Sequence, residues 1–355
     1  LEMLIFGIAL AVAVVPEALP AVVTISLAIG MQRMAKCNAL VSRLPTVETL
    51  GCTSVICSDK TGTLTRNEMT ARQIWQAGSM TDITGQGYEP VGEFEVGGSR
   101  ARPSPELTLL LETATLASDA VLEKTDHWEV RGDPTEGALV VAAAKAGLKK
   151  GILEAAQPRF AEIPFTSESK RMTTVHRDGD TTIACSKGAP ESILSTCSRI
   201  LTSRGEEELT GGRRQDIEEA ASCMAENALR VIGISRKTDC TLEDCEQGQV
   251  FLGLVGIIDP PRQEAAEAIK TCRKAGIRPV MITGDHPVTA SAIARELGIT
   301  KTSEVMTGAE LDRLADNELA SRVPDIDVYA RVSPEHKLRV VNAWRSRGRI
   351  VAMTG

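Results

Sequence analysis

The chain opens with a long apolar run that differs from everything after it. Residues 1–30 contain two charged side chains, Glu2 and Glu17. A helix of that length and composition can cross a bilayer. Basic residues follow the run from Arg33 onward, so we expect a transmembrane segment whose carboxyl end enters the cytoplasm.

Two regions further along show short apolar strands that alternate with helical patterns. In residues 31–67, a helical stalk and a short helix lead to an apolar stretch at 53–57. In residues 259–355 we expect strands at 279–282, 328–331 and 350–353 and helices at 263–275, 287–297 and 335–346. Such alternation is typical of a doubly wound parallel sheet and places the chain in the α/β class.

The residues between these regions have another pattern. Residues 71–100 alternate and are rich in Gly, Thr and Glu, which predicts short antiparallel strands joined by turns. After them we expect helices at 105–123, 134–149, 189–197 and 214–228, strands at 160–163, 171–177, 181–186, 230–236 and 250–256, and an exposed loop at 203–213. The pattern predicts one inserted α+β domain over residues 68–258.

Asp59 stands two residues after the first predicted strand, residues 53–57. The carboxyl ends of parallel strands are where open α/β sheets hold their ligands. A carboxylate there can attack a phosphoryl group and form an aspartyl phosphate. Two places on lies Thr61, which cannot act as the general acid or base that would help water to cleave this acyl phosphate. We therefore predict a phosphoenzyme that persists.

Residues 59–65, Asp-Lys-Thr-Gly-Thr-Leu-Thr, resemble the phosphorylation signature of the P-type cation-transporting ATPases. The resemblance covers essentially the whole chain and points to calcium-pump-like, type II members. It implies a haloacid-dehalogenase-like phosphorylation domain, an inserted nucleotide-binding domain and an N-terminal transmembrane helix. The implied borders are 1–34 for the helix and stalk, 35–67 and 259–355 for the phosphorylation domain, and 68–258 for the nucleotide-binding domain.

The resemblance also assigns roles around the nucleophile. Lys60 and Thr61 follow Asp59 in the signature, and the Asp59 carboxylate and the Thr61 carbonyl are implied as ligands of Mg²⁺. Further Mg²⁺ ligands are expected from an Asp-Gly-Val-Asn-Asp motif that would follow Gly355.

Two later motifs complete the implied catalytic set. Thr283-Gly284-Asp285 resembles the family's second phosphate loop, in which Thr283 and Gly284 would hold phosphoryl oxygens. Asp285 would orient the domain interface or the nucleotide. Residues 330–337 resemble the third motif, in which Lys337 would neutralise charge on Asp59 and the incoming phosphoryl group. We assign no role to His336.

Six residues of the inserted domain align with the family's ATP pocket, namely Glu136, Phe165, Lys170, Lys187, Gly188 and Arg230. Phe165 aligns with the adenine-stacking phenylalanine, Glu136 with a glutamate that faces the adenine, and Arg230 with an arginine that reaches the phosphates. Ser167 stands where the family has an arginine. The chain has no G-x-x-x-x-G-K-[ST] loop.

A second site is predicted inside the apolar run. The two prolines of Pro16-Glu17-Ala18-Leu19-Pro20 free backbone carbonyls, and these carbonyls with the Glu17 carboxylate make an all-oxygen site suited to Ca²⁺. The segment resembles the Pro-Glu-Gly-Leu-Pro of the fourth transmembrane helix of calcium pumps. The implied ligands are the Glu17 side chain and the carbonyls of Val12, Ala13 and Val15.

Taken together, these patterns predict an internal fragment of an integral membrane pump whose nucleotide and phosphorylation domains are cytoplasmic. Its expected partners are ATP, Mg²⁺, the transported cation, the bilayer, and the actuator domain and remaining transmembrane helices of the same polypeptide. A net charge of −7 without a basic stripe argues against nucleic-acid binding. Nine cysteines without a metal-binding spacing predict reduced thiols.

Three alternatives stay open from the sequence. A soluble haloacid-dehalogenase-type phosphatase would share the Asp59 nucleophile, although Thr61 and the apolar run argue against it. A non-catalytic nucleotide-binding module would keep the pocket alone. A Na⁺/K⁺, H⁺ or Mn²⁺ pump would share most of the sequence. Heavy-metal pumps carry a Cys-Pro pair at this point, and Val15-Pro16 argues against that class.

Overall fold

The computed structural model describes residues 3, 5–7, 18–302 and 304–355. Its first long element is the helix α2 (Leu19–Lys36), which is followed by the short helix α3 (Leu44–Gly51). Within the described residues, no helix is long and apolar enough to cross a membrane. The cation ligands predicted at Val12, Ala13, Val15 and Glu17 lie outside the described residues.

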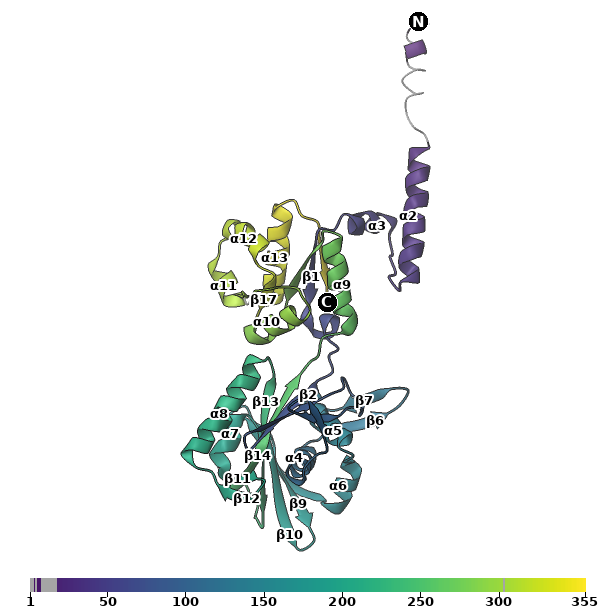
Figure 1. The fold of residues 1–355 in the computed structure, drawn as a ribbon. Coiled ribbons are helices and arrows are strands. Elements are labelled where there is room, and N and C mark those ends of the chain that lie inside the picture. The colour runs from purple at the N-terminus through teal and green to yellow at the C-terminus, as the bar shows by residue number, and fades with distance from the viewer. Residues whose placement is uncertain (1–2, 4, 8–17, 303) are drawn as a thin grey trace.

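A parallel sheet of five strands lies between α2 and the rest of the molecule (Figure 1). Its order is β16 (Met306–Thr307), β17 (Val328–Ala330), β15 (Arg278–Ile282), β1 (Val55–Asp59) and β18 (Val351–Thr354). All four strand pairs are parallel. This confirms the α/β prediction for the two flanking regions of the chain.

Helices cover both faces of this sheet, as the alternation of its side chains requires. On β15, Val280 and Ile282 pack in one apolar cluster while Met281 packs in another. The first cluster also holds side chains of α11 (Gly308–Arg313), α12 (Asp316–Arg322) and α13 (Pro334–Ser346). The second holds side chains of α9 (Gln263–Lys274) and α10 (Pro287–Glu296). Strands buried on both faces explain the near-continuous apolar runs in the sequence.

A larger, mainly antiparallel sheet of eleven strands forms the other half of the molecule. Its path runs β5 (Ser99–Ala101), β4 (Phe94–Val96), β3 (Ser79–Ile83), β2 (Thr70–Gln76), β14 (Gln249–Ile258), β13 (Arg230–Thr238), β10 (Thr181–Gly188), β9 (Arg171–Asp178) and β8 (Arg159–Ile163). β11 (Cys197–Thr202) pairs with β14, and β12 (Gly205–Glu208) pairs with β11. The antiparallel strands predicted within residues 71–100 are confirmed.

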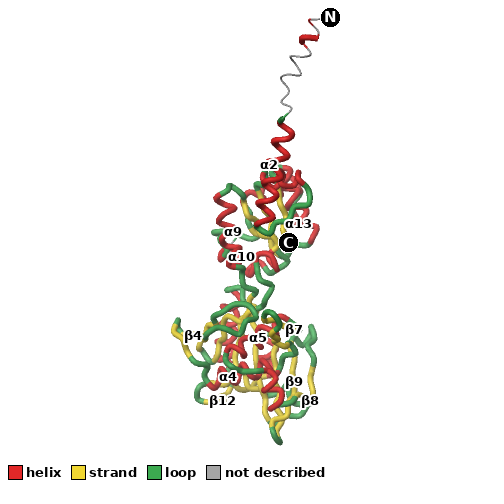
Figure 2. The backbone as a smooth tube through the Cα atoms, turned by 90° about the vertical axis from the view of Figure 1, so that its right-hand side faces the viewer, coloured by secondary structure: helices red, strands yellow, loops and turns green. Residues whose placement is uncertain are grey.

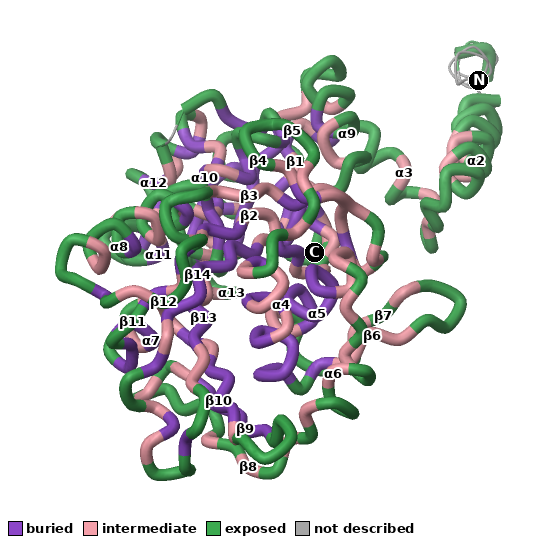
Figure 3. Tube along the Cα trace, turned by 60° about the horizontal axis from the view of Figure 1, so that its bottom comes forward, coloured by how far each residue is buried: buried purple, intermediate pink, exposed green. Residues whose placement is uncertain are grey.

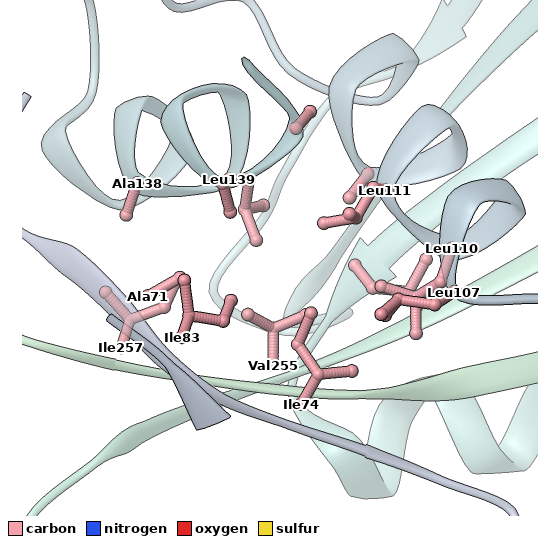
Figure 4. Close-up of a cluster of buried hydrophobic side chains, with 14 of the residues drawn as sticks. Ala71, Ile74, Ile83, Leu107, Leu110, Leu111, Ala138, Leu139, Val255 and Ile257 are labelled. Atoms are coloured by element: carbon pink, nitrogen blue, oxygen red, sulfur yellow. The ribbon is translucent and has the colours of Figure 1, made fainter. Parts of the chain in front are cut away.

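This sheet also buries both faces. Figure 4 shows Ile74 and Val255 on the side of α4 (Pro105–Leu116) and α5 (Pro134–Lys145). Their neighbours Trp75 and Leu254 pack instead with α7 (Pro190–Thr196) and α8 (Gly211–Glu226). In Figure 3, much of α4 and α5 is coloured buried, while α2 is mostly exposed.

The two sheets are joined where the chain leaves and re-enters the parallel part (Figure 2). Thr65 forms a bridge with Pro261. The Asp259 carboxylate accepts hydrogen bonds from the Thr65 hydroxyl at 2.6 Å and from the Asn67 N–H at 2.9 Å. One buried carboxylate therefore holds both crossing segments together.

Two local predictions were wrong. The helix expected at 105–123 ends at Leu116, and a hairpin of β6 (Val121–Lys124) and β7 (Trp128–Arg131) follows it. Arg159 donates to the Leu116 carbonyl at the end of this helix and Lys150 to the Ser118 carbonyl just beyond it, and neither contact is visible in the local sequence. The loop expected at 203–213 contains β12, because pairing with β11 orders it.

Lys145 gives a prediction about stability and pH. Its ammonium donates to the carbonyls of Thr84 at 2.8 Å and Gly85 at 3.3 Å. Burial, with repulsion from Arg72, lowers its pKa from 10.5 to about 8. Between these values the unfolded chain binds more protons, so the contribution of Lys145 to stability rises with pH. We expect the free energy of unfolding of the parent, relative to Lys145→Met, to increase by about 1 to 2 kcal/mol from pH 7 to 9.5, the lower figure allowing for the partial exposure of the side chain.

Urea unfolding at the two pH values, followed by circular dichroism, measures this difference. Lys124→Met removes an exposed lysine and serves as the control. An equal change for both variants would contradict the assignment to Lys145.

Candidate functional site

Asp59 ends β1, a central strand of the parallel sheet with β15 on one side and β18 on the other. The chain then makes a tight turn over Lys60–Leu64, in which Gly62 has a φ of 73°. The Asp59 side chain is 25% exposed and forms an ion pair with Lys337 Nζ, 278 residues further along the chain. Two residues that the sequence predicted for one site thus meet at the carboxyl edge of the sheet.

The loop predicted to bind phosphate lies next to Asp59. In the register of β1 and β15, Asp59 lies opposite Ile282. The loop that starts with Thr283 therefore follows directly after the residue opposite Asp59. The Thr283 hydroxyl accepts a hydrogen bond from the Asp285 N–H at 3.1 Å, which closes the loop on itself. Gly355, after β18, also approaches this edge, because a Cβ there would lie 2.7 Å from Asp59 Cβ.

Lys60 points away from the edge and into the protein. Its side chain is 6% exposed and forms ion pairs with Asp285 at 2.5 Å and with Asp259 at 3.6 Å. It therefore connects the phosphate-loop candidate to the two crossing segments. Asp259 was not predicted as a site residue, although it stands in the Asp-Pro-Pro-Arg sequence where the chain returns to the parallel sheet.

The six residues predicted for the nucleotide line one cavity of about 570 Å³ on the antiparallel part. The cavity is bordered by α5, β10, β13 and the segment before β9, and its full lining is Asp133, Thr135, Glu136, Leu139, Phe165, Lys170, Met172, Lys187, Gly188, Ala189, Arg230, Val231 and Ile232. Its wall is mainly apolar, with charged groups at a few points. That combination is typical of small-molecule sites.

Lys187 and Glu136 face each other inside this cavity. The Lys187 ammonium contacts Glu136 Oε1 at 2.8 Å and also donates to the Ala117 carbonyl. Glu136 Oε2 accepts from the N–H groups of Asp119 at 2.6 Å and Ala120 at 2.9 Å. Burial lowers the pKa of Lys187, and the Glu136 charge opposes that change. The pair therefore also holds the loop after α4 in place.

The other predicted residues lie nearer the mouth. Phe165 is 61% exposed, beside an apolar lining. Lys170 pairs with Glu191 at 3.3 Å, and Arg230 donates to the Thr135 hydroxyl at 2.9 Å. At Gly188 a Cβ would come within 2.5 Å of the Lys170 carbonyl, so the close approach of the two segments requires glycine.

Among the described residues, no three His, Cys, Asp or Glu side chains come together in an arrangement that could hold a metal ion. All nine cysteines fall among those residues, and each is free, including the buried Cys240 and Cys245.

Comparison with known proteins gives one consistent family. Residues 106–264 match the family profile described as P-type ATPase, cytoplasmic domain N. The chain is 45% identical to calcium-transporting ATPase 1 of Bacillus cereus and 42% identical to the calcium-transporting ATPase of Bacillus subtilis. It is 41% identical to calcium-transporting ATPase type 2C member 1 of Bos taurus. Each match covers 100% of this chain but 39%, 41% and 37% of the respective relative, so the chain spans about two fifths of their length.

Proposed function

Because the chain belongs to the P-type ATPases, we propose that it binds ATP and accepts its γ-phosphoryl group on Asp59 within a cation pump. The observation that carries this proposal is the ion pair of Asp59 with Lys337 at the carboxyl edge of the parallel sheet. A carboxylate nucleophile beside a cation is the arrangement that phosphoryl transfer needs, because the phosphoryl oxygens bring negative charge.

In the proposed transfer, an Asp59 carboxylate oxygen forms a bond to the γ-phosphorus while the bond from that phosphorus to the β-γ bridging oxygen breaks. ADP takes the bonding electrons as it leaves. Lys337 moves its charge from the carboxylate onto the phosphoryl oxygens, and Thr283 and Gly284 offer a hydroxyl and an N–H to the same oxygens. Thr61 in place of a second acid leaves the acyl phosphate without a nearby general base.

Mg²⁺ fits the residues at this edge. One carboxylate, one backbone carbonyl and phosphate oxygens are donors that this ion prefers, and Asp59 and Thr61 provide the first two. Bound there, the ion would neutralise charge between the nucleotide phosphates and the nucleophile. Asp285, already paired with Lys60, would keep the loop after β15 in place.

The nucleotide is proposed to bind in the cavity of the antiparallel part. Phe165 would stack on the adenine, Glu136 would face it, and Arg230 would reach the phosphates. Lys170, Lys187 and Gly188 would complete the pocket. The cavity and Asp59 belong to different sheets that are joined by two crossing segments. Transfer therefore requires the two parts to approach each other, a kind of domain closure that is common in enzymes.

Calcium is the cation we propose for transport. The Pro16–Pro20 segment would supply the carboxylate and free carbonyls for such a site, and relatives from three organisms carry calcium in their names. The segment up to residue 34 would form a transmembrane helix and stalk, with haloacid-dehalogenase-like and nucleotide domains in the cytoplasm. An actuator domain and further transmembrane helices would come from the same polypeptide.

The experiment that tests this function is acid-quenched phosphoenzyme formation from γ-labelled ATP in the full-length parent. Calcium is titrated against a chelator. Label that requires Ca²⁺ and is released by hydroxylamine supports both the acyl phosphate and the ion. Label that depends on Na⁺, Mn²⁺ or pH instead of Ca²⁺ would keep the pump but change the transported ion. Phosphatase activity without a trappable adduct would favour a soluble phosphatase.

Phe165→Ala should weaken ATP binding about tenfold, since stacking of a base on an aromatic ring contributes roughly 1–3 kcal/mol. Calorimetric titration of the chain with ATP measures the change. Phe160→Ala is the matched control, because Phe160 is 50% exposed, stacks on Arg177 and does not line the cavity. Equal affinities for the two variants would remove Phe165 from the pocket.

A further inference from the structure

His336 forms two hydrogen bonds that hold its ring in one orientation. Its Nδ1 accepts from the Ser333 N–H at 3.1 Å, and its Nε2–H donates to Asp312 Oδ1 at 2.7 Å. Only the neutral ring with its proton on Nε2 satisfies both partners. The side chain is 13% exposed, so the ring is largely enclosed by these contacts.

The ring also packs against α11. A Cβ added to Gly308 would come within 3.0 Å of two ring atoms of His336 and within 2.3 Å of the Arg331 carbonyl. One turn further along α13, Arg339 donates to the carbonyls of Leu311 and Leu314, each at 2.8 Å. The first turns of α13 are thereby fixed on α11 at two successive points.

Lys337 is the next residue of that first turn. Its backbone N–H donates to the Ser333 carbonyl at 3.2 Å, and its ammonium pairs with Asp59. A long, flexible side chain points toward a distant carboxylate reliably only when the turn that carries it is held in place. Besides the core packing of Val340, the contacts that hold this turn include those of His336 and Arg339.

We propose that His336, held by Asp312, is a positioning residue that directs the Lys337 ammonium onto Asp59. Its importance for phosphoryl transfer rests on the function proposed above. Helices commonly have Glu or Gln at this third position, where the side chain caps the N-cap N–H. A glutamate here would place a second carboxylate beside Asp312 and compete with Asp59 for Lys337. The neutral imidazole caps the helix without adding charge and also reaches α11.

Two readouts test this inference. The first is trace acylation of the chain followed by mass spectrometry, which reports the reactivity of Lys337 whether or not the protein phosphorylates. We expect His336→Ala to increase labelling of Lys337 at least fivefold, with Asp59→Asn as the positive control. The second is the rate of phosphoenzyme formation in the full-length parent, where we expect a loss of about tenfold at unchanged ATP affinity.

Variants of graded severity separate positioning from general damage. His336→Gln keeps an acceptor for Ser333 and should recover most of the phosphorylation rate. Asp312→Ala keeps the His336 side chain and should show part of the loss in phosphorylation rate. If His336→Ala fails to fold, Asp312→Ala tests the inference in its place. His127→Ala removes a comparable pair, His127 with Glu129 at 2.7 Å on the β6–β7 hairpin, and should change neither readout.

Unchanged Lys337 labelling in both His336→Ala and Asp312→Ala would overturn the inference. Equal losses in His336→Ala, His336→Gln and His127→Ala would overturn it as well, because they would show a non-specific effect. Absence of phosphoenzyme in the parent would instead overturn the proposed function, while the labelling would still decide whether His336 positions Lys337.

Discussion

Asp59→Asn is expected to abolish phosphoenzyme formation in the full-length protein while ATP binding is retained. The amide nitrogen and oxygen of asparagine cannot form the acyl phosphate, so the loss should be complete rather than partial. ATP binding should persist, because the cavity that contains Phe165 and Lys187 lies on the other sheet. Removing one negative charge from the carboxyl edge of the parallel sheet should leave the affinity for ATP equal or slightly higher.

Acid-quenched labelling with γ-labelled ATP and a parallel binding titration measure the two properties on the same preparation. Asp178→Asn, on the exposed turn between β9 and β10, is the control and should be labelled like the parent. Hydroxylamine-sensitive label that survives in Asp59→Asn would assign the nucleophile to another residue.

Lys60→Met should produce the largest loss of stability among the substitutions considered. Lys60 lies between Asp285 and Asp259 and is almost fully buried, so its removal leaves two carboxylates facing each other without a cation. Breaking a buried ion pair from one side costs about 3–5 kcal/mol. Because Asp285 is 32% exposed and water can reach it, we expect a loss near the lower end, about 3 kcal/mol.

Urea unfolding of the whole chain tests this expectation. Lys170→Met is the matched control, since Lys170 pairs with Glu191 at the surface, where side-chain exposures are 57% and 65%. Exposed pairs contribute less than about 1 kcal/mol. A similar small loss for both lysines would show that the Lys60 cluster does not stabilise the fold.

The same substitution separates a structural from a catalytic role for Lys60. If the lysine acts by holding the loop after β15, phosphorylation in Lys60→Met should recover at low temperature, as stability is regained. A phosphorylation defect that persists in the fully folded variant would place Lys60 in the chemistry itself.

Local sequence was enough for much of this molecule. The strand that ends at Asp59 is a short apolar run, and its place at the carboxyl edge of a parallel sheet follows from the alternation of strands and helices around it. The prediction of antiparallel strands within residues 71–100 succeeded for a similar reason, because turn residues and alternating side chains are local properties. The six residues that line the cavity were predicted from short motifs that resemble those of a known family.

Contacts between distant residues were beyond such reasoning. Nothing near Leu116 indicates that Arg159 and Lys150 will bind carbonyls at and just beyond the end of its helix. Nothing near Gly205 indicates that β12 will pair as it does. The sequence assigned no role to His336, because its partner Asp312 lies 24 residues away on another helix. Side-chain partners of this kind depend on how the helices pack on the sheet, which no short window of sequence contains.

By itself the sequence predicted a nucleophile at Asp59 and most of the strands and helices around it from residue type and local periodicity. Through their resemblance to a family, its motifs also predicted the six residues that line one cavity. The tertiary structure decided what the charged groups do. It placed Lys337 on Asp59, turned Lys60 inward between two carboxylates and engaged Lys187 with Glu136. The physical reason is that an ion pair requires proximity in space, and proximity across 278 residues is set by the order of strands in the sheet.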